Sequence, residues 1–258
     1  MTNKIIAFAN QKGGVAKTTT VAELGELLSQ QFGKKVLMID MDPQSSLTAI
    51  RTDQIKLSQS GAPTMTNVML RQSAIEDTFI ALKPNLWLAP ATLTLSDAEL
   101  SLVQATLREL VLKNALEKLK RNPVYTFDYI LVDCPPSRGL LTVNALSASD
   151  LVVIPVQAEY QALLGRQLVK KTISEVQAAI NDQLQIYGYV MTMASRTNIS
   201  KEASEILEND SIPVLGTIPR STRVTEAGVN KVSTYEFEKE NPAGVAYRRL
   251  AEKLIKEV

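Results

Sequence analysis

Two lysines flank a glycine pair near the beginning of the sequence. The segment reads Asn10-Gln11-Lys12-Gly13-Gly14-Val15-Ala16-Lys17-Thr18-Thr19-Thr20. A glycine turn between a strand and a helix lets backbone N–H groups and the positive helix end converge on phosphate oxygens. Lys17 would neutralise charge on the β- and γ-phosphates, and the Thr18 hydroxyl would bind Mg²⁺. The segment therefore predicts a nucleotide-binding site.

This segment departs from the usual phosphate-binding pattern G-x-x-x-x-G-K-[ST], whose glycines would fall at Gln11 and Ala16. It matches the deviant form K-G-G-x-x-K-[ST], which carries an additional lysine at Lys12. The alternative is a glycine turn with incidental lysines, and the strand-then-helix context favours the phosphate site. We expect eight residues to contact the nucleotide: Lys12, Gly13, Gly14, Val15, Ala16, Lys17, Thr18 and Thr19.

Aspartates stand at the ends of two apolar runs. Asp40 and Asp42 follow the run 35–39, and Asp133 follows the run 129–132. Ligands of open parallel sheets bind at the carboxyl ends of the strands, where a carboxylate can hold Mg²⁺ or orient the attacking water. Aspartates also cap helices and form turns, which is the alternative for each one alone. Together with the lysine segment they favour the functional interpretation.

The rest of the chain alternates strand patterns with helix patterns. Near-continuous apolar runs typical of strands covered on both faces occupy 5–9, 35–39, 129–132, 151–156, 186–191 and 214–218. This order predicts an α/β fold with a mostly parallel, twisted sheet flanked by helices on both faces, like that of P-loop NTPases. At 258 residues, we expect a single nucleotide-binding domain over residues 1–258.

Some helices can be predicted from their caps. Ser96 to Glu99 has capping-box spacing and predicts a long helical stretch to about Lys120. Asn241-Pro242 predicts a capped final helix, whose Tyr247, Leu250 and Leu254 would pack on the domain. The stretch 52–75 is the least regular and predicts a loop with one short helix.

Composition excludes several classes of protein. The chain has no His and a single Cys, Cys134, so a His base, a disulfide framework and a single-chain iron–sulfur cluster are excluded. The formal net charge is +1, so nucleic-acid binding would need local clusters of Lys and Arg. We find no signal-peptide pattern and no apolar run of the roughly 20 residues that would span a bilayer.

These segments together resemble the ParA family of partition ATPases, in the wider group that includes MinD. The resemblance covers almost the whole chain, at 12–19, 36–44, 86–95 with Glu99, 129–137, 151–165, 196–198 and 218–227. Because the first strand pattern begins at Ile5, we expect the short form of the family, without a helix-turn-helix before it.

The resemblance implies a role for each matching residue. Lys12 matches the family's signature lysine, which reaches the nucleotide of a partner subunit. Lys17 matches the lysine of the subunit's own nucleotide. Asp42 matches the carboxylate that positions the attacking water, with Asp40 in a supporting role. Asp133 matches the magnesium-linked Walker B aspartate. The implied catalytic residues are Lys12, Lys17 and Asp42, and the implied metal-site residues are Thr18, Asp42 and Asp133. Asp40 and Pro219 join the residues 12–19 as implied nucleotide-binding residues.

The resemblance also implies partners. Arg196 and Arg223 lie where short-form relatives carry arginines for non-specific DNA contact, and 192–198 and Pro219 lie where the adenine approaches. The implied protein is a cytoplasmic, nucleoid-associated ATPase that dimerises with ATP and Mg²⁺, releases ADP, and works with a ParB-like stimulator. No membrane contact is expected.

Ala16 departs from the family, which usually has Gly there. In a left-handed conformation Ala would be strained by about 1 kcal/mol or more, and in a helical conformation it would cost nothing. Since Ala16 directly precedes the helix, we expect the helical conformation. Slower turnover is the consequence if that expectation fails.

Other functions remain open. A membrane-bound ATPase similar to MinD would need a basic amphipathic tail, and the apolar face of 248–258 is expected to belong to the core. A nucleotide-gated scaffold or DNA-binding module would have lost hydrolysis through Ala16. The cargo could be a plasmid, a chromosome or a protein body such as a carboxysome.

Overall fold

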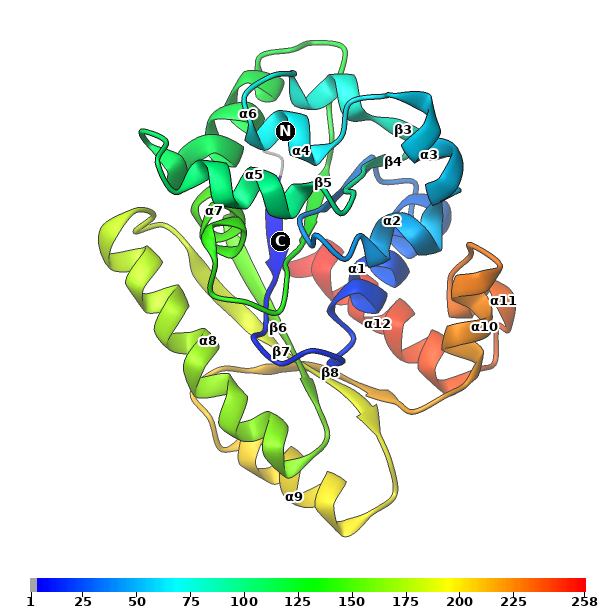
Figure 1. Cartoon of the computed structure of the whole chain (residues 1–258). Helices are drawn as coiled ribbons and strands as arrows, with labels where there is room; N and C mark the ends of the chain where they lie inside the picture. The colour runs from blue at the N-terminus through cyan, green and yellow to red at the C-terminus, as the bar shows by residue number, and fades with distance from the viewer. Residues whose placement is uncertain (1–3) are drawn as a thin grey trace.

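A sheet of eight strands organises the chain in the computed structural model, which describes residues 4–258 but not the side chains of 160–165 and 199. Residues 1–3 therefore lie outside the description. So do the side chains of 160–165, which belong to the segment 151–165 that carries part of the family resemblance. The strand order is β3-β4-β2-β5-β1-β6-β7-β8 (Figure 1). All neighbouring pairs are parallel except β3 and β4, which are antiparallel. The predicted α/β class with a mostly parallel sheet is confirmed.

The six predicted strands all form, with slightly shifted ends. The strands are β1 Lys4–Phe8, β2 Val36–Asp40, β3 Ile80–Lys83, β4 Leu86–Ala89, β5 Tyr129–Asp133, β6 Leu151–Gln157, β7 Gln185–Ala194 and β8 Val214–Pro219. β3 and β4 were not predicted. They are only four residues each, and Asn85 in the left-handed region turns the chain between them.

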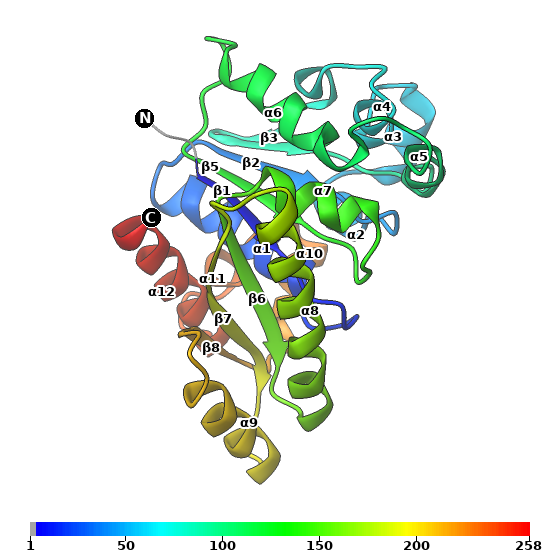
Figure 2. The same ribbon diagram turned by 90° about the vertical axis from the view of Figure 1, so that its left-hand side faces the viewer.

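Helices cover both faces of the sheet, as predicted (Figure 2). One face packs against α4 Met65–Met69, α5 Leu95–Leu102, α6 Val111–Lys120, α7 Leu140–Ala148, α8 Tyr160–Ala179 and α9 Asn198–Glu208. The other face packs against α1 Lys17–Glu26, α2 Ser46–Arg51 and α12 Pro242–Glu257, with α10 Arg223–Val229 and α11 Thr234–Phe237 at its margin. The remaining helical segments are α3 Gln54–Ser60, η1 Leu27–Gln31, η2 Ile75–Thr78 and η3 Arg108–Leu110.

The final helix forms as its cap predicts. The Asn241 side chain accepts a hydrogen bond from Ala243 N at 3.1 Å, and Pro242 occupies the first turn. Tyr247, Leu250 and Leu254 are buried against the sheet. Within residues 4–258, every helix is too short or too polar to cross a bilayer.

Two helix predictions were wrong. The stretch from Ser96 to Lys120 is broken, because α5 ends at Leu102 and Leu107 adopts a left-handed backbone before α6 begins. Ser96 lies inside α5 and donates to Leu93 O instead of capping it. The stretch 52–75 holds two helices rather than one, because Asp53 caps α3 and Thr64 begins α4.

Candidate nucleotide and magnesium site

The glycine turn leaves the carboxyl end of β1 and is held by contacts with β6 and β7 on one side of that strand. Asn10 is buried, and its side-chain amide donates to Pro155 O of β6 at 2.7 Å. The Asn10 Oδ1 atom accepts from Lys12 N at 3.0 Å. On the far side of the turn, the Thr192 hydroxyl of β7 donates to Val15 O at 3.1 Å. The sheet therefore holds the turn in shape at its carboxyl edge.

Ala16 lies in the left-handed region, with φ 64° and ψ 32°. The expectation of a helical Ala16 was wrong. The neighbouring carbonyl groups explain the conformation, because Val15 O is held by Thr192 while Ala16 O accepts from both the N–H and the hydroxyl of Thr20. A left-handed alanine costs about 1–2 kcal/mol relative to its relaxed conformation. Gly14 has a similar φ of 74°, where glycine carries no such cost.

Lys17 is the first residue of α1 and is 7% exposed. Its Nζ atom donates to Lys12 O at 3.4 Å, so the side chain folds back under the turn. Burial lowers the pKa of Lys17, while the negative charges of Asp133 and Asp42 act in the opposite direction. A buried ammonium with few acceptors would gain from a phosphate group at the turn.

Asp133 lies directly beside the turn at the end of β5. In the register of the sheet it pairs with Phe8 on one side and Asp40 on the other. It is fully buried, and neither carboxylate oxygen has a hydrogen-bond partner within the described residues. Burial and the negative charge of Asp40 raise the pKa of Asp133 well above its usual range, while the nearby Thr18 hydroxyl and the Lys17 ammonium act in the opposite direction. An orphaned buried carboxylate of this kind is costly unless a cation or a donor joins it.

Asp40 and Asp42 differ in how many hydrogen bonds their carboxylates accept. Asp40 is fully buried and accepts from Thr48 N at 2.9 Å, Thr48 Oγ1 at 2.7 Å and Asp42 N at 3.1 Å. Burial raises the pKa of Asp40 to about 6. The Asp40 carboxylate therefore anchors α2 through Thr48 and fixes the backbone at Asp42. Asp42 uses one oxygen to accept from Gln44 N at 2.9 Å.

The residues present fit a magnesium ion that is completed by phosphate oxygens. Mg²⁺ prefers oxygen ligands and is usually held by one or two carboxylates together with phosphates and waters. Asp133 supplies an unpartnered carboxylate, and Thr18 and Asp42 supply further oxygens around Lys17. Within residues 4–258, no three His, Cys, Asp or Glu side chains gather closely enough to hold a metal by themselves. The arrangement suits a metal that arrives with its nucleotide.

Lys12 does not point at Asp133 but lies at the outer side of the turn. Its Nζ atom is 3.5 Å from Glu159 Oε2, and both side chains are partly exposed. Glu159 immediately precedes α8, and its Oε1 atom accepts from Gln157 Nε2 at 2.7 Å. The two lysines of the turn therefore occupy different places, one inside the site and one at its rim.

The ends of β7 and β8 are paired with each other, and β7 contacts the turn. Pro219 is in register with Ala194, and Arg220 N donates to Ala194 O at 2.9 Å. The hydrogen bond from Thr192 to Val15 O places the start of the segment 192–198 beside the turn, and Pro219 lies on β8, the next strand of the sheet. These are the segments where the family resemblance implies that the adenine approaches.

Comparison with known proteins decides the family. A family model described as an AAA domain matches residues 3–186. The sporulation initiation inhibitor protein Soj of Bacillus subtilis is 42% identical over 230 residues, which is 87% of each chain. The chromosome partitioning protein ParA of Caulobacter vibrioides is 36% identical over 260 residues, covering 98% of this chain and 94% of its own length. The chain belongs to the ParA/Soj family of partition ATPases.

A solved structure agrees with this assignment. The structure described as cobyrinic acid a,c-diamide synthase from Mycobacterium smegmatis, with bound ATP analogue and magnesium, has a TM-score of 0.83 and 35% sequence identity. The match covers 99% of this chain and 95% of that one. The resemblance to the ParA family that the sequence predicts is confirmed, and so is the P-loop ATPase type of fold.

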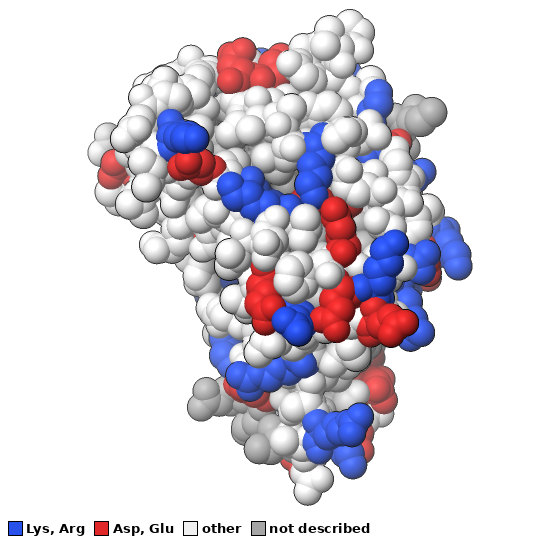
Figure 3. All heavy atoms as spheres, turned by 90° about the vertical axis from the view of Figure 1, so that its right-hand side faces the viewer, with Lys and Arg blue, Asp and Glu red and all other residues white. Residues whose placement is uncertain are grey.

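The two arginines predicted to contact DNA, Arg196 and Arg223, follow the ends of two neighbouring strands. β7 ends at Ala194 and β8 ends at Pro219. Both arginines are exposed. Arg223 forms ion pairs with Glu226 and with Glu238, the latter at 3.1 Å. The face that carries α10–α12 shows Lys and Arg interspersed with Asp and Glu rather than one basic patch (Figure 3). Any DNA contact by Arg223 must therefore compete with its own carboxylate partners.

Sequence reasoning missed several residues that support the site. Thr48 anchors Asp40, Asn10 and Thr192 hold the turn, and Glu159 pairs with Lys12. Asn10 could have been found from its place at the end of the first strand. Thr192 and Glu159 lie far away in the sequence from the residues that they contact, and Thr48, eight residues after Asp40, lies in a segment without a signal that identifies it. Cys134 is buried in the apolar core.

Proposed function

We propose that this protein is a magnesium-dependent ATP hydrolase that dimerises with ATP, binds DNA without sequence preference and partitions plasmid or chromosome DNA. The proposal takes residues 1–258 as a single nucleotide-binding domain that works in the cytoplasm on the nucleoid. It rests on family membership and, above all, on one observation: the buried carboxylate of Asp133, whose oxygens have no hydrogen-bond partner within the described residues, lies close enough to the buried Lys17 at the glycine turn for their charges to interact.

Each residue of the turn has a proposed part in binding the triphosphate. The backbone N–H groups of 13–19 cradle the phosphate oxygens, and Lys17 neutralises the charge of the β- and γ-phosphates. Thr18 and Asp133 hold the magnesium ion, which, when bound, neutralises charge that develops on the phosphate oxygens. The burial of Lys17 and Asp133 supports this part of the proposal, because the ligand supplies the partner that each of them lacks.

Hydrolysis is assigned to Asp42, which orients the attacking water. Asp40 acts through Asp42 by fixing the turn that carries it, with a hydrogen bond from Asp42 N at 3.1 Å. An arrangement that relies on positioning and charge suits phosphoryl transfer, where the protein needs little covalent chemistry. Turnover is expected to be slow and to rise when a ParB-like partner binds.

Lys12 provides the link between two subunits. Its place at the rim, outside the Lys17–Asp133 pair, supports a role toward the nucleotide of a second copy. To reach that nucleotide it must leave Glu159. The ATP-bound dimer would then present Arg196 and Arg223 twice, and doubling the phosphate contacts steepens the dependence of DNA binding on salt.

The experiment compares DNA binding by the wild type and an Arg196→Glu/Arg223→Glu variant, with ATP and Mg²⁺, on two unrelated duplexes over a salt series. We expect the wild type to bind both duplexes alike and the variant to bind both more weakly, with a smaller salt slope. Lys201→Glu/Lys239→Glu is a matched control at two other surface lysines. Equal binding by the wild type and the arginine variant would place the DNA contact elsewhere, and no ATP-dependent binding by the wild type would overturn the proposal.

A further inference from the structure

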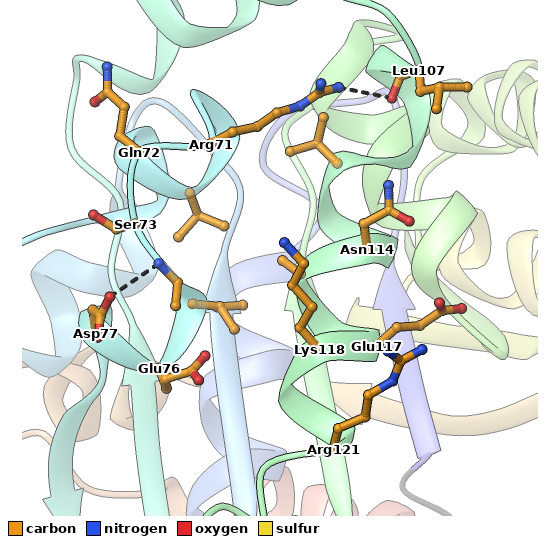
Figure 4. A pocket seen from close by; sticks show the side chains of 15 residues that line it. Arg71, Gln72, Ser73, Glu76, Asp77, Leu107, Asn114, Glu117, Lys118 and Arg121 are labelled. Carbon is orange, nitrogen blue, oxygen red and sulfur yellow. Dashed lines mark hydrogen bonds between the residues drawn. The ribbon is translucent and has the colours of Figure 1, made fainter.

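A groove of about 750 Å³ lies between the segment 71–77 and helix α6, and none of the residues 10–20 lines it (Figure 4). Its charged side chains are three cations and three acids: Arg71, Lys118, Arg121, Glu76, Asp77 and Glu117. Because these charges balance, they favour neither an anionic nor a cationic ligand. We assign no occupant to this groove.

A cavity of about 490 Å³ lies on the other face of the sheet, between α1, α2 and α10. Residues 49–51, which form the second half of α2, line it together with Thr19 and Glu23 of α1 and four residues of α10. Close packing against α10 therefore does not fix the carboxyl end of α2. Another contact must hold this end of the helix in place.

Helix α2 follows directly after Asp42, the proposed water-positioning residue. It has only six residues, and helices this short are not stable on their own. Ser45 precedes it in a left-handed conformation and donates its N–H to Asp42 O at 2.8 Å. Near the start of the helix, Thr48 donates to Asp40. Because a hydrogen-bonded turn joins Asp42 to α2, a shift of the helix moves Asp42 as well.

Arg51 ends α2 and pairs with Glu26, the last residue of α1. Arg51 Nη1 is 3.3 Å from Glu26 Oε1, and both side chains are only 2% exposed. The Arg51 Nε and Nη1 atoms have no hydrogen-bond partner within the described residues. Glu23, one turn earlier on α1, uses both carboxylate oxygens to accept from Thr234. The ion pair with Glu26 is therefore the contact that holds the guanidinium.

Helix α1 connects this ion pair to the glycine turn. Lys17 begins the helix and Glu26 ends it. Val21 and Leu24 between them are fully buried in the core, so α1 cannot move without disturbing close packing. One end of α1 thus carries Lys17 and Thr18, which are proposed to bind the nucleotide and its metal, and the other end holds α2.

We propose that Arg51 is a positioning residue for hydrolysis, whose ion pair with Glu26 holds α2 against α1 and so fixes Asp42 relative to Lys17. The inference rests on the proposed ATP hydrolysis and adds a residue to it. Arg51 acts through Asp42 and does not contact the reacting atoms. Because the residues 12–19 and Asp133, proposed to bind the nucleotide and its metal, lie outside α2, loss of Arg51 should lower kcat and leave KM for ATP nearly unchanged.

The first measurement is hydrogen exchange of the nucleotide-free protein, followed by mass spectrometry. In Arg51→Met the amides of 45–52 should exchange at least about tenfold faster than in the wild type, because α2 loses its carboxyl-terminal anchor. Arg166→Met is the matched control. Arg166 of α8 also pairs with a largely buried acid, Asp210, at 3.2 Å, and its Nε atom also has no hydrogen-bond partner within the described residues. In this control, exchange of 45–52 should stay within about twofold of the wild type.

The second measurement is steady-state ATP hydrolysis with Mg²⁺, at a temperature at which every variant is folded. Arg51→Met should lower kcat about tenfold or more with KM within about twofold, while Arg166→Met should keep both near the wild-type values. Arg51→Met/Glu26→Gln removes both buried charges, so its melting temperature should lie above that of Arg51→Met. Its kcat should stay low, because the anchor is still missing.

Three results would overturn the inference alone while the wild type hydrolyses ATP. They are wild-type kcat in Arg51→Met, unaltered exchange of 45–52 in that variant, and recovery of kcat together with the melting temperature in the double variant. The last result would show that Arg51 only stabilises the fold. A wild type that binds ATP with Mg²⁺ but does not hydrolyse it would overturn the proposed function, and the inference with it.

Discussion

Replacing Ala16 by glycine should stabilise the nucleotide-free protein. Ala16 sits at φ 64° and ψ 32°, where an alanine is strained by about 1–2 kcal/mol. Glycine removes that strain but adds about 0.5–1 kcal/mol of backbone entropy to the unfolded chain. The net gain is about 0.5–1 kcal/mol. For a chain of 258 residues, such a gain raises the melting temperature by about 1–4 °C.

Two neighbouring glycines provide matched controls for this measurement. A Cβ atom added at Gly13 or at Gly14 would meet nothing within 4 Å, but only Gly14 has a left-handed φ, of 74°. Gly14→Ala should therefore lower the melting temperature by about 1–4 °C, since about 1–2 kcal/mol of strain is introduced while about 0.5–1 kcal/mol of backbone entropy is removed from the unfolded chain. Gly13→Ala should leave it unchanged or slightly raised.

Differential scanning calorimetry of the four proteins without nucleotide gives the result directly. A lower melting temperature for Ala16→Gly would refute the reasoning. So would equal shifts for Gly13→Ala and Gly14→Ala, because they would show that backbone conformation does not control stability at this turn.

Three other perturbations test the buried acid, the rim lysine and the proposed water-positioning residue. Burial raises the pKa of Glu23 to about 7, above its unfolded value near 4.5, so its contribution to stability is lost as pH rises from about 4.5 to 7. The loss amounts to about 3 kcal/mol at most, and Glu23→Gln should reduce the difference between the free energies of unfolding measured with urea at pH 5 and at pH 8. The same difference in both proteins would contradict this prediction. Glu159→Gln removes the partner of Lys12, an exposed pair worth about 0.2–1 kcal/mol in each subunit. The dissociation constant of the ATP-bound dimer should then fall about 2- to 30-fold, as measured by analytical ultracentrifugation. A weaker dimer would contradict the proposal that Lys12 reaches the nucleotide of the second subunit. Asp42→Ala should dimerise with ATP while releasing phosphate on the order of 100-fold more slowly, and wild-type turnover would remove Asp42 from catalysis.

Local sequence patterns predicted those parts of the fold that are determined by residues near one another in the sequence. Runs of apolar residues identified the central strands, and Asn241-Pro242 identified the start of α12. The strand-end positions of Asp40 and Asp133 were predicted for the same reason, since parallel strands bring their carboxyl ends to one edge. The register of β2 with β5 then brings these two aspartates side by side.

Features set by distant residues were not predictable. The conformation of Ala16 depends on hydrogen bonds that Val15 O and Ala16 O accept, one of them from Thr192 in β7. The break before α6 depends on a left-handed Leu107, for which neither Leu nor its neighbours give a turn signal. The pair between Lys12 and Glu159 joins segments that only the completed sheet brings together.

The central claim is that the glycine turn, Lys17 and Asp133 bind ATP with magnesium. Isothermal titration of ATP into the purified protein, with and without Mg²⁺, tests it most directly, with Lys17→Ala and Asp133→Asn as the decisive variants. The account predicts magnesium-dependent binding by the wild type, loss of binding in Lys17→Ala and loss of the magnesium dependence in Asp133→Asn. Absence of heat with the wild type, or unaltered magnesium-dependent binding in both variants, would contradict it.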